Sequence, residues 1–411
     1  MTSPSRRQAL ANLDNWASNW QIEMGVPGLS IVVRDKNGII FNQSYGVQDQ
    51  DSGIPLKDSK PILPIGSQSK TFTAVALMQL IADGHTHPVT GRKLSLQDPI
   101  TELLPNLGKP EWLNGVTLAD ALAHRTRFGN GDYNKEWGDN PPSTDMLRND
   151  IRMSDIEPSK TPGYSNRMYD MLGVVVEDTS GMKFNDYIQR QIVERHKLGE
   201  IYPSYNAIPE ADRARVPTGY DGPNLDRKVG LSDWRGTAAS GGFYGSPSAI
   251  TNFYHKLAHG RILPDHKVDT NNETGMFQKI TKGGGWLGYG IQMRSMEPND
   301  NYNKKNPYHV PLGQGLLYGH TGGVPGYQSD TRYNPQTGLT VSVFSTALYT
   351  PGLTSDPKME AVIEQRMKEH AERTGLPIVM SEVFKQLGTT EPSPLHAPVK
   401  NEKQSVPLPD K

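Results

Sequence analysis

The sequence predicts an α/β fold in which one sheet is built from both ends of the chain, with an all-α domain inserted between them. Two β-type runs and a helical pattern come first, short helical segments between Pro- and Gly-rich loops follow, and β-type runs return near the end. Segments in this order can share one sheet with helices against it. We therefore expect a discontinuous α/β domain over residues 1–85 and 235–376, and a mainly helical domain over residues 86–234.

The N-terminal part predicts a helix, a hairpin and a second helix. Residues 5–24 carry leucine and tryptophan at helical spacing, as in an amphipathic helix. Two apolar β-rich runs then flank residues 35–38, whose sequence Asp-Lys-Asn-Gly indicates a hairpin turn. Residues 68–83 are apolar almost all round, which is typical of a buried helix, and Gly84 suits its C-terminal end.

The middle and C-terminal parts differ in their patterns. Helices are predicted within the segments 95–107, 117–126 and 166–181. Strands are predicted at residues 289–296, 328–335 and 339–349. A closing helix is predicted at residues 356–374. Because Pro and Lys are frequent near the end, we expect residues 377–411 to form a flexible tail.

Composition excludes several classes of function. The chain has 411 residues, a net charge of −1 and no cysteine. The balanced charge provides no basic field for nucleic acid, and the lack of cysteine excludes disulfides and thiolate chemistry. The N-terminus lacks the apolar segment of a secretory signal, and no run of 18 apolar residues occurs. We therefore expect a cytoplasmic protein without a membrane partner; composition leaves its oligomeric state open.

Ser67 and Lys70 lie one helical turn apart where the apolar segment 68–83 begins. Residues at i and i+3 share a helix face, and the N-terminus of a helix favours a developing anion. Desolvation would lower the pKa of Lys70, which would then take the proton of the Ser67 hydroxyl and activate it as a nucleophile. The same tetrapeptide also fits an N-cap serine followed by a lysine that reaches solvent.

Tyr164 and Asn166 are separated by one residue just before a predicted helix. Alternate residues of an extended turn face one side, so both side chains can reach one cleft. A tyrosine whose pKa is lowered by a lysine acts as a base or relay, and an asparagine holds a substrate carbonyl or orients the lysine. The alternative is a buried tyrosine followed by a helix-capping asparagine.

The segment His320-Thr321-Gly322-Gly323 precedes a turn and a strong strand. Its glycines allow a substrate backbone to approach the strand edge. The backbone N–H of Gly323 can pair with that of Ser67 as an oxyanion hole, and His320 and Thr321 can bind a substrate carboxylate or carbonyl. The alternative is a Gly-rich hairpin with an incidental histidine.

The three motifs occur in the order S-x-x-K, Y-x-N and H-T-G, which resembles the order in the penicillin-recognising serine hydrolases. Over about residues 5–370 the chain resembles the class C β-lactamase group of the serine β-lactamase and penicillin-binding-protein superfamily. That group includes D-alanyl-D-alanine carboxypeptidases, D-aminopeptidases, D-amino acid amidases, family VIII esterases and statin-type acyltransferases. The resemblance implies a β-lactamase/transpeptidase-like fold, with an antiparallel sheet flanked by helices plus an all-α domain.

The resemblance also implies roles for the motif residues. Ser67 would form an acyl-enzyme with Lys70 as its base, and Tyr164 would protonate the leaving group and activate the deacylating water. Asn166 would contact the lysine and the substrate. His320 would help to orient the tyrosine and to bind substrate, in a position where many relatives have lysine. No metal or organic cofactor is implied.

Some features depart from the pattern of the group. The pair Pro162-Gly163 adjoins Tyr164 directly, and the segment after Ala123 reads His-Arg-Thr-Arg-Phe in place of His-Thr-Ser-Gly-Leu. The loops 128–160 and 203–235 are expected to border the cleft and to choose the substrate. Histidine in the third motif disfavours a dedicated β-lactamase.

These features predict a serine hydrolase that cleaves an ester or amide bond of a small molecule or short peptide. Carboxylesterase and D-amino-acyl amidase or peptidase are the two leading forms. Acyl transfer to an alcohol or amine from the same acyl-enzyme is an alternative. A non-catalytic binding or assembly module of the same fold is an alternative of another class.

Overall fold

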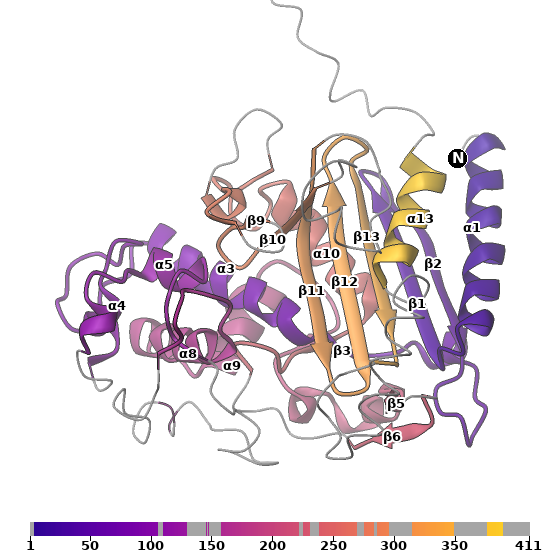
Figure 1. Cartoon of the computed structure of the whole chain (residues 1–411), viewed down its shortest axis with the longest axis horizontal. Helices are drawn as coiled ribbons and strands as arrows, with labels where there is room; N and C mark the ends of the chain where they lie inside the picture. The colour runs from indigo at the N-terminus through magenta and orange to yellow at the C-terminus, as the bar shows by residue number, and fades with distance from the viewer. Residues whose placement is uncertain are drawn as a thin grey trace, which may run out of the picture.

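The computed structural model describes most of the chain in separate ranges (Figure 1). The described residues are 4–105, 110–129, 145, 147, 158–221, 225–230, 238–268, 275–282, 286–295, 315–348 and 376–388. The α-helices are α1 (Pro4–Glu23), α2 (Leu56–Ser59), α3 (Ser69–Ala82), α4 (Ile100–Leu103), α5 (Leu118–Leu122), α8 (Asn166–Ser180), α9 (Phe184–Tyr187), α10 (Pro247–Ala258) and α13 (Leu376–Gly388). The strands are β1 (Gly28–Asp35), β2 (Gly38–Gly46), β3 (Leu63–Pro64), β4 (Ile201–Tyr202), β5 (Gly219–Asp221), β6 (Arg227–Val229), β7 (Tyr244–Gly245), β8 (Thr281–Lys282), β9 (Trp286–Leu287), β10 (Gln292–Ser295), β11 (Leu316–Val324), β12 (Tyr327–Asn334) and β13 (Leu339–Ser345).

The main sheet joins the two ends of the chain. Its order is β2-β1-β13-β12-β11-β10-β9-β8, and every neighbouring pair is antiparallel. The hairpin predicted at residues 35–38 connects β1 to β2, and the Asp35 carboxylate accepts the backbone N–H groups of Asn37 and Gly38. The expected fold class, an antiparallel sheet flanked by helices, is confirmed.

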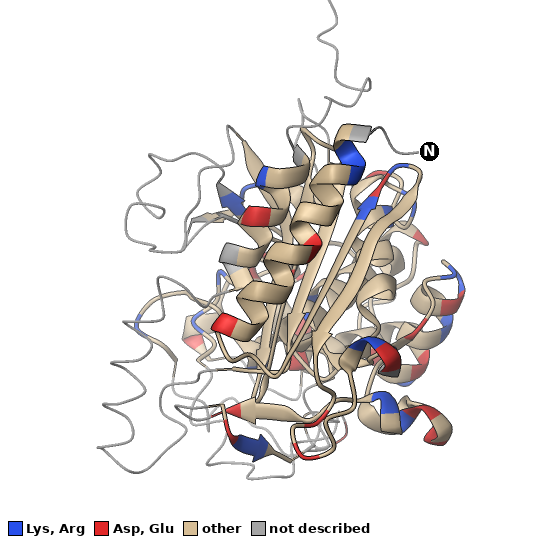
Figure 2. Ribbon diagram, turned by 90° about the vertical axis from the view of Figure 1, so that its right-hand side faces the viewer, with Lys and Arg blue, Asp and Glu red and all other residues tan. Residues whose placement is uncertain are grey.

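Helices cover both faces of this sheet (Figures 1 and 2). Helices α1 and α13 lie together on one face, where Leu13, Val341 and Val383 belong to one buried cluster. Helix α10 packs on the opposite face against β1, β12 and β13. Figure 2 shows acidic and basic residues interspersed in this view.

The expectation of a flexible tail from residue 377 is wrong for its first part, because residues 376–388 form helix α13. Val379, Met380, Val383 and Phe384 are buried, and the helix contacts α1 and β13. These residues recur at helical spacing, which indicates a helix. The Pro- and Lys-rich composition of the residues that follow obscured this signal. The predicted helix 356–374 and residues 389–411 lie outside the described residues.

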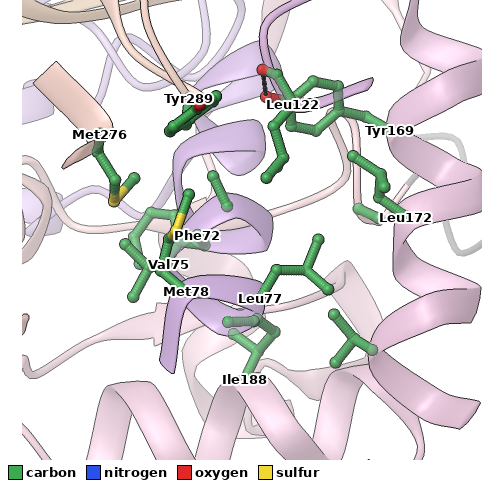
Figure 3. Close-up of a cluster of buried hydrophobic side chains, with 14 of the residues drawn as sticks. Phe72, Val75, Leu77, Met78, Leu122, Tyr169, Leu172, Ile188, Met276 and Tyr289 are labelled. Atoms are coloured by element: carbon green, nitrogen blue, oxygen red, sulfur yellow. Dashed lines mark hydrogen bonds between the residues drawn. The ribbon is translucent and has the colours of Figure 1, made fainter. Parts of the chain in front are cut away.

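Helix α3 forms the centre of the helical half, as its all-round apolar sequence predicts. Its side chains pack between α8, the π-helix Ile188–Glu194 and the end of α5 (Figure 3). In that cluster the hydroxyl of Tyr169 donates to the backbone carbonyl of Leu122 at 2.6 Å. Because α3 is buried from its first turn, any polar side chain in that turn is desolvated.

The other predicted helices are present with shorter bounds. Of the segment 95–107, the described residues 95–105 form only α4, and the segment 117–126 forms only α5, whose first turn has a capping box of Thr117 and Asp120. Helix α8 ends as predicted at Gly181, which has φ +70°. Among the described residues, no helix has both the length and the apolar character needed to cross a membrane.

Candidate active site

Ser67 lies in the 3-10 helix Gly66–Gln68, directly before α3. Gly66 has φ +53°, and a Cβ added to it would lie 2.7 Å from the backbone nitrogen of Gly323. Only glycine combines this left-handed conformation with so close a contact to β11. The turn therefore brings the half-buried Ser67 beside the H-T-G segment, more than 250 residues away in the chain.

Lys70 is fully buried and has three polar neighbours. Its Nζ donates to Asn166 Oδ1 and to the carbonyl oxygen of Ser240, both at 2.6 Å, and lies 3.1 Å from Ser67 Oγ. Desolvation lowers the pKa of Lys70 to about 7, although the charge of Asp170 acts in the opposite direction. A neutral amine has two protons and one lone pair, so the two amide-type acceptors leave the lone pair for the hydroxyl proton of Ser67.

Tyr164 lies on the other side of the serine. Its side chain hydrogen-bonds the Ser67 hydroxyl, and Lys70 Nζ is 4.9 Å from the centre of its ring. Desolvation raises the pKa of Tyr164, and the bond to Ser67 lowers it in part. Because 37% of Tyr164 is exposed, water limits the rise. The phenol is therefore protonated and accessible at neutral pH.

His124 is part of the site, although the sequence reasoning did not select it. Its ring stacks on Tyr164 with centroids 4.2 Å apart, and its Nδ1 accepts the backbone N–H of Ser165 at 3.1 Å. It is a rare non-glycine residue with φ +55°. Burial and the nearby Lys70 and His320 lower the pKa of His124, so a neutral ring supports the tyrosine. Its segment was noted in the sequence, but no spacing rule links it to Tyr164 across forty residues.

Arg125, Arg127 and Phe128, which follow His124 in the chain, have partners outside the three motifs. Arg125 pairs with Asp120, and Arg127 donates to the carbonyl oxygen of Ser159 at 2.7 Å. Phe128 is buried with its ring edge-on to Trp112. Core packing and pairing with neighbouring residues therefore describe the contacts of these three residues.

His320, Thr321 and Gly323 all lie on β11. The His320 ring centre is 6.4 Å from that of Tyr164, and its Nδ1 is 2.5 Å from the carbonyl oxygen of Thr321. Thr321 is bonded to Gln292 of β10 through both its N–H and its hydroxyl. Burial lowers the pKa of His320 to about 3, with the charge of Lys70 as the next cause.

Gly322 closes the junction between β11 and the serine turn. A Cβ at this position would lie 1.9 Å from the carbonyl oxygen of Ile65, and the Ser329 hydroxyl donates to the same carbonyl at 2.9 Å. The glycine therefore allows the backbone at Ile65 to approach β11. This close approach sets the distance between Ser67 and the H-T-G segment.

Two further groups that act on Lys70 come from distant segments. The carbonyl oxygen of Ser240 and the carboxylate of Asp170 act on Lys70 from the loop after residue 238 and from α8. A backbone carbonyl carries no side-chain signal, and Asp170 is one of many acidic residues in the chain. Only the tertiary structure identifies them.

Comparisons with known proteins agree with this arrangement. The family model described as Beta-lactamase matches residues 13–363. A beta-lactamase of Pseudomonas fluorescens is 25% identical over 347 residues, which cover 80% of this chain and 90% of that protein.

Solved structures show the same fold at low sequence identity. The D-amino acid amidase from Ochrobactrum anthropi SV3 complexed with L-phenylalanine amide has a TM-score of 0.64 and 19% identity, covering 92% of this chain and 99% of that chain. The beta-lactamase/D-alanine carboxypeptidase from Pseudomonas syringae has a TM-score of 0.62 and 21% identity, covering 89% of this chain and 99% of that chain.

Proposed function

Because this chain belongs to the beta-lactamase family, we propose that it is a serine hydrolase that forms an acyl-enzyme on Ser67. Its substrate is an ester or amide of a small molecule or short peptide. The observation that carries the proposal is the bonding of Lys70, whose lone pair is left for the hydroxyl of Ser67. A buried lysine with a pKa near neutrality is suited to act as a general base.

Acylation follows from this geometry. The Lys70 lone pair takes the Ser67 proton as Oγ attacks the substrate carbonyl carbon. The electron pair of the carbonyl bond moves to its oxygen, and the backbone N–H groups of Ser67 and Gly323 stabilise that oxyanion. Asn166 and the Ser240 carbonyl hold the lysinium that forms, since both accept hydrogen bonds from it.

Release of the leaving group needs a proton, and Tyr164 is placed to supply it. Its phenol is bonded to Ser67 and is accessible. The phenol protonates the leaving oxygen or nitrogen as the carbonyl re-forms, and Lys70 then returns a proton to the phenolate. In deacylation the same pair takes a proton from an attacking water and returns it to Ser67.

The bond cleaved is an ester or an amide, as in a carboxylesterase or a D-amino-acyl amidase. Support for the amide comes from the similarity in fold to a D-amino acid amidase. Capture of the acyl group by an alcohol or amine in place of water would make the enzyme an acyltransferase. A panel of p-nitrophenyl esters and D-aminoacyl p-nitroanilides, assayed with and without an added amine, separates these outcomes.

Labelling with a small alkyl fluorophosphonate tests the nucleophile. We expect a single phosphonyl adduct on Ser67 by peptide mapping, and none in Ser67→Ala, because Lys70 contacts and activates that hydroxyl. Ser52→Ala, which removes an exposed hydroxyl in a turn, should label like the wild type. An adduct that persists in folded Ser67→Ala would assign the chemistry to another residue.

A further inference from the structure

Gln292 takes both hydrogen-bond donors of Thr321. The Thr321 backbone N–H donates to Gln292 Oε1 at 3.1 Å, and the Thr321 hydroxyl lies 2.9 Å from the same atom. Arg332 Nη2 also donates to it at 3.4 Å. Two obligatory donors identify this atom as the carboxamide oxygen, which only accepts. The Thr321 hydroxyl therefore gives its proton to Gln292 and keeps only lone pairs for a ligand.

His320 is engaged in a similar way. Its Nδ1 is 2.5 Å from the carbonyl oxygen of Thr321, and a carbonyl only accepts, so Nδ1 carries the proton. Burial and the charges of Lys70 and Arg332 oppose a second proton on the ring, whose pKa is lowered to about 3. The Nε2 atom of a neutral ring with this tautomer is an acceptor.

The arginines near this motif are also engaged. Arg332 donates to Asp330 at 2.7 Å and to the backbone carbonyl of Gln292 at 2.8 Å. Arg294 lies 3.4 Å from the other oxygen of Asp330. These contacts link β12 to β10 on the two sides of β11, and Arg332 holds Gln292, the residue that accepts both donors of Thr321.

The motif lies beside the nucleophile. Gly322, next to Thr321, contacts the carbonyl of Ile65, two residues before Ser67. His320 and Thr321 point to opposite faces of β11, so both faces of the strand present acceptors close to the serine turn. A substrate acylated on Ser67 must place its neighbouring groups along this strand.

We infer that this site, given the serine hydrolase proposed above, prefers substrates that present a hydrogen-bond donor or a neutral group to Thr321 and His320, and disfavours a free carboxylate there. An N–H of a carboxamide or amine finds a lone pair on whichever of the two side chains it approaches. A carboxylate finds none of the donors it needs on either side chain and faces like-signed partial charge. Gln292 is then a specificity-determining residue, since it removes the donors that Thr321 would otherwise offer.

Matched fluorophosphonates test this inference. The probes share the fluoride leaving group and carry an alkyl arm that ends in a carboxamide or a carboxylate, at three arm lengths. The measurement is the second-order rate of Ser67 labelling by intact-protein mass spectrometry. At one or more arm lengths, we expect the carboxamide probe to react at least about fivefold faster than the carboxylate probe, a ratio that corresponds to the free energy of one hydrogen bond. At no arm length should the carboxamide probe react more slowly than the carboxylate probe.

Two variants locate the origin of the preference. Gln292→Met frees the donors of Thr321 at similar side-chain length, and His320→Lys introduces a donor. Each should reduce the carboxamide-to-carboxylate ratio at least threefold. Gln43→Met on β2 and His85→Lys near the end of α3 make the same substitutions at partly or fully exposed positions and should leave the ratio unchanged.

The outcomes separate the inference from the function on which it rests. If no probe labels Ser67, the proposed nucleophile is wrong. If the probes label Ser67 and the carboxylate series reacts as fast, the inference is overturned while the proposed function stands. A ratio that is unchanged in both Gln292→Met and His320→Lys also overturns it, and His320→Lys suffices where Gln292→Met does not fold.

Discussion

Lys70 shows how burial turns an ordinary residue into a reactive one. A lysine in water holds its proton until well above neutral pH, but the first turn of α3 removes this one from water. Asp170 favours the charged form and so limits the fall of the pKa, which reaches about 7. The residue therefore works as a base at neutral pH while its partners Asn166 and Ser240 keep it in place.

The rate of Ser67 phosphonylation should depend on pH through Lys70. Only the neutral amine accepts the hydroxyl proton, so the rate should rise about tenfold per unit below pH 7 and level off above it. Labelling rates between pH 5 and 9 check this. A flat profile across that range would contradict the role of Lys70.

Asp170→Asn should shift the midpoint of this pH profile. The carboxylate raises the pKa of Lys70, so its removal should lower that pKa and move the midpoint of the profile to lower pH. Asp178→Asn, at an exposed position near the end of the same helix, serves as the control. A midpoint that rises in Asp170→Asn would reverse the assigned sign of this interaction.

At the scale of elements, the site depends on one junction. The 3-10 turn that carries Ser67 meets β11 where Gly66 and Gly322 have no side chains. Strand β11 lies inside the sheet between β12 and β10, so its position is set by backbone hydrogen bonds on both sides. A rigid strand and a tight turn can thus hold Ser67 and Gly323 in fixed relation.

Gly322→Ala should break this junction. Its Cβ would lie 1.9 Å from the Ile65 carbonyl oxygen, which is backbone and cannot rotate away. We expect a fall of at least tenfold in the phosphonylation rate of Ser67, together with a lower melting temperature. Gly230→Ala, whose Cβ meets no atom within 4 Å, should match the wild type in both measurements.

At the scale of the molecule, the sheet is closed by segments from both ends of the chain. Helix α1 and helix α13 pack together over β13 and its neighbours, and their apolar side chains form a cluster separate from the one around α3. The active-site helices α3 and α8 belong to the other cluster. The packing of α1 and α13 on the sheet and the chemistry at Ser67 therefore depend on different clusters.

Phe384→Ala should separate these two properties. Removal of a buried phenylalanine ring costs about 3–5 kcal/mol of unfolding free energy. Because Phe384 lies in the cluster of α1 and α13, the phosphonylation rate of the folded enzyme should stay unchanged. Urea denaturation measures the loss of unfolding free energy. Lys385→Ala, at an exposed neighbouring residue, is the control. A stability equal to that of the control would show that α13 contributes little.

The sequence by itself determined what is local or periodic. The spacing of Ser67 and Lys70 fixes a shared helix face, the apolar run after them predicts a buried helix, and the turn at residues 35–38 predicts a hairpin. The order of three motifs was sufficient to predict the family. Helix α13 was readable in the same way, from its own periodicity, and was missed because its composition was judged together with the residues that follow it.

The tertiary structure alone decided which groups act on those residues. His124, Ser240 and Gln292 reach the site from segments with no spacing relation to Ser67, and one of them acts through its backbone carbonyl. The charge on Lys70 and the donor or acceptor character of His320 and Thr321 depend on burial and on the protons their neighbours accept. Such properties arise from contacts between distant segments, so no local pattern in the chain encodes them.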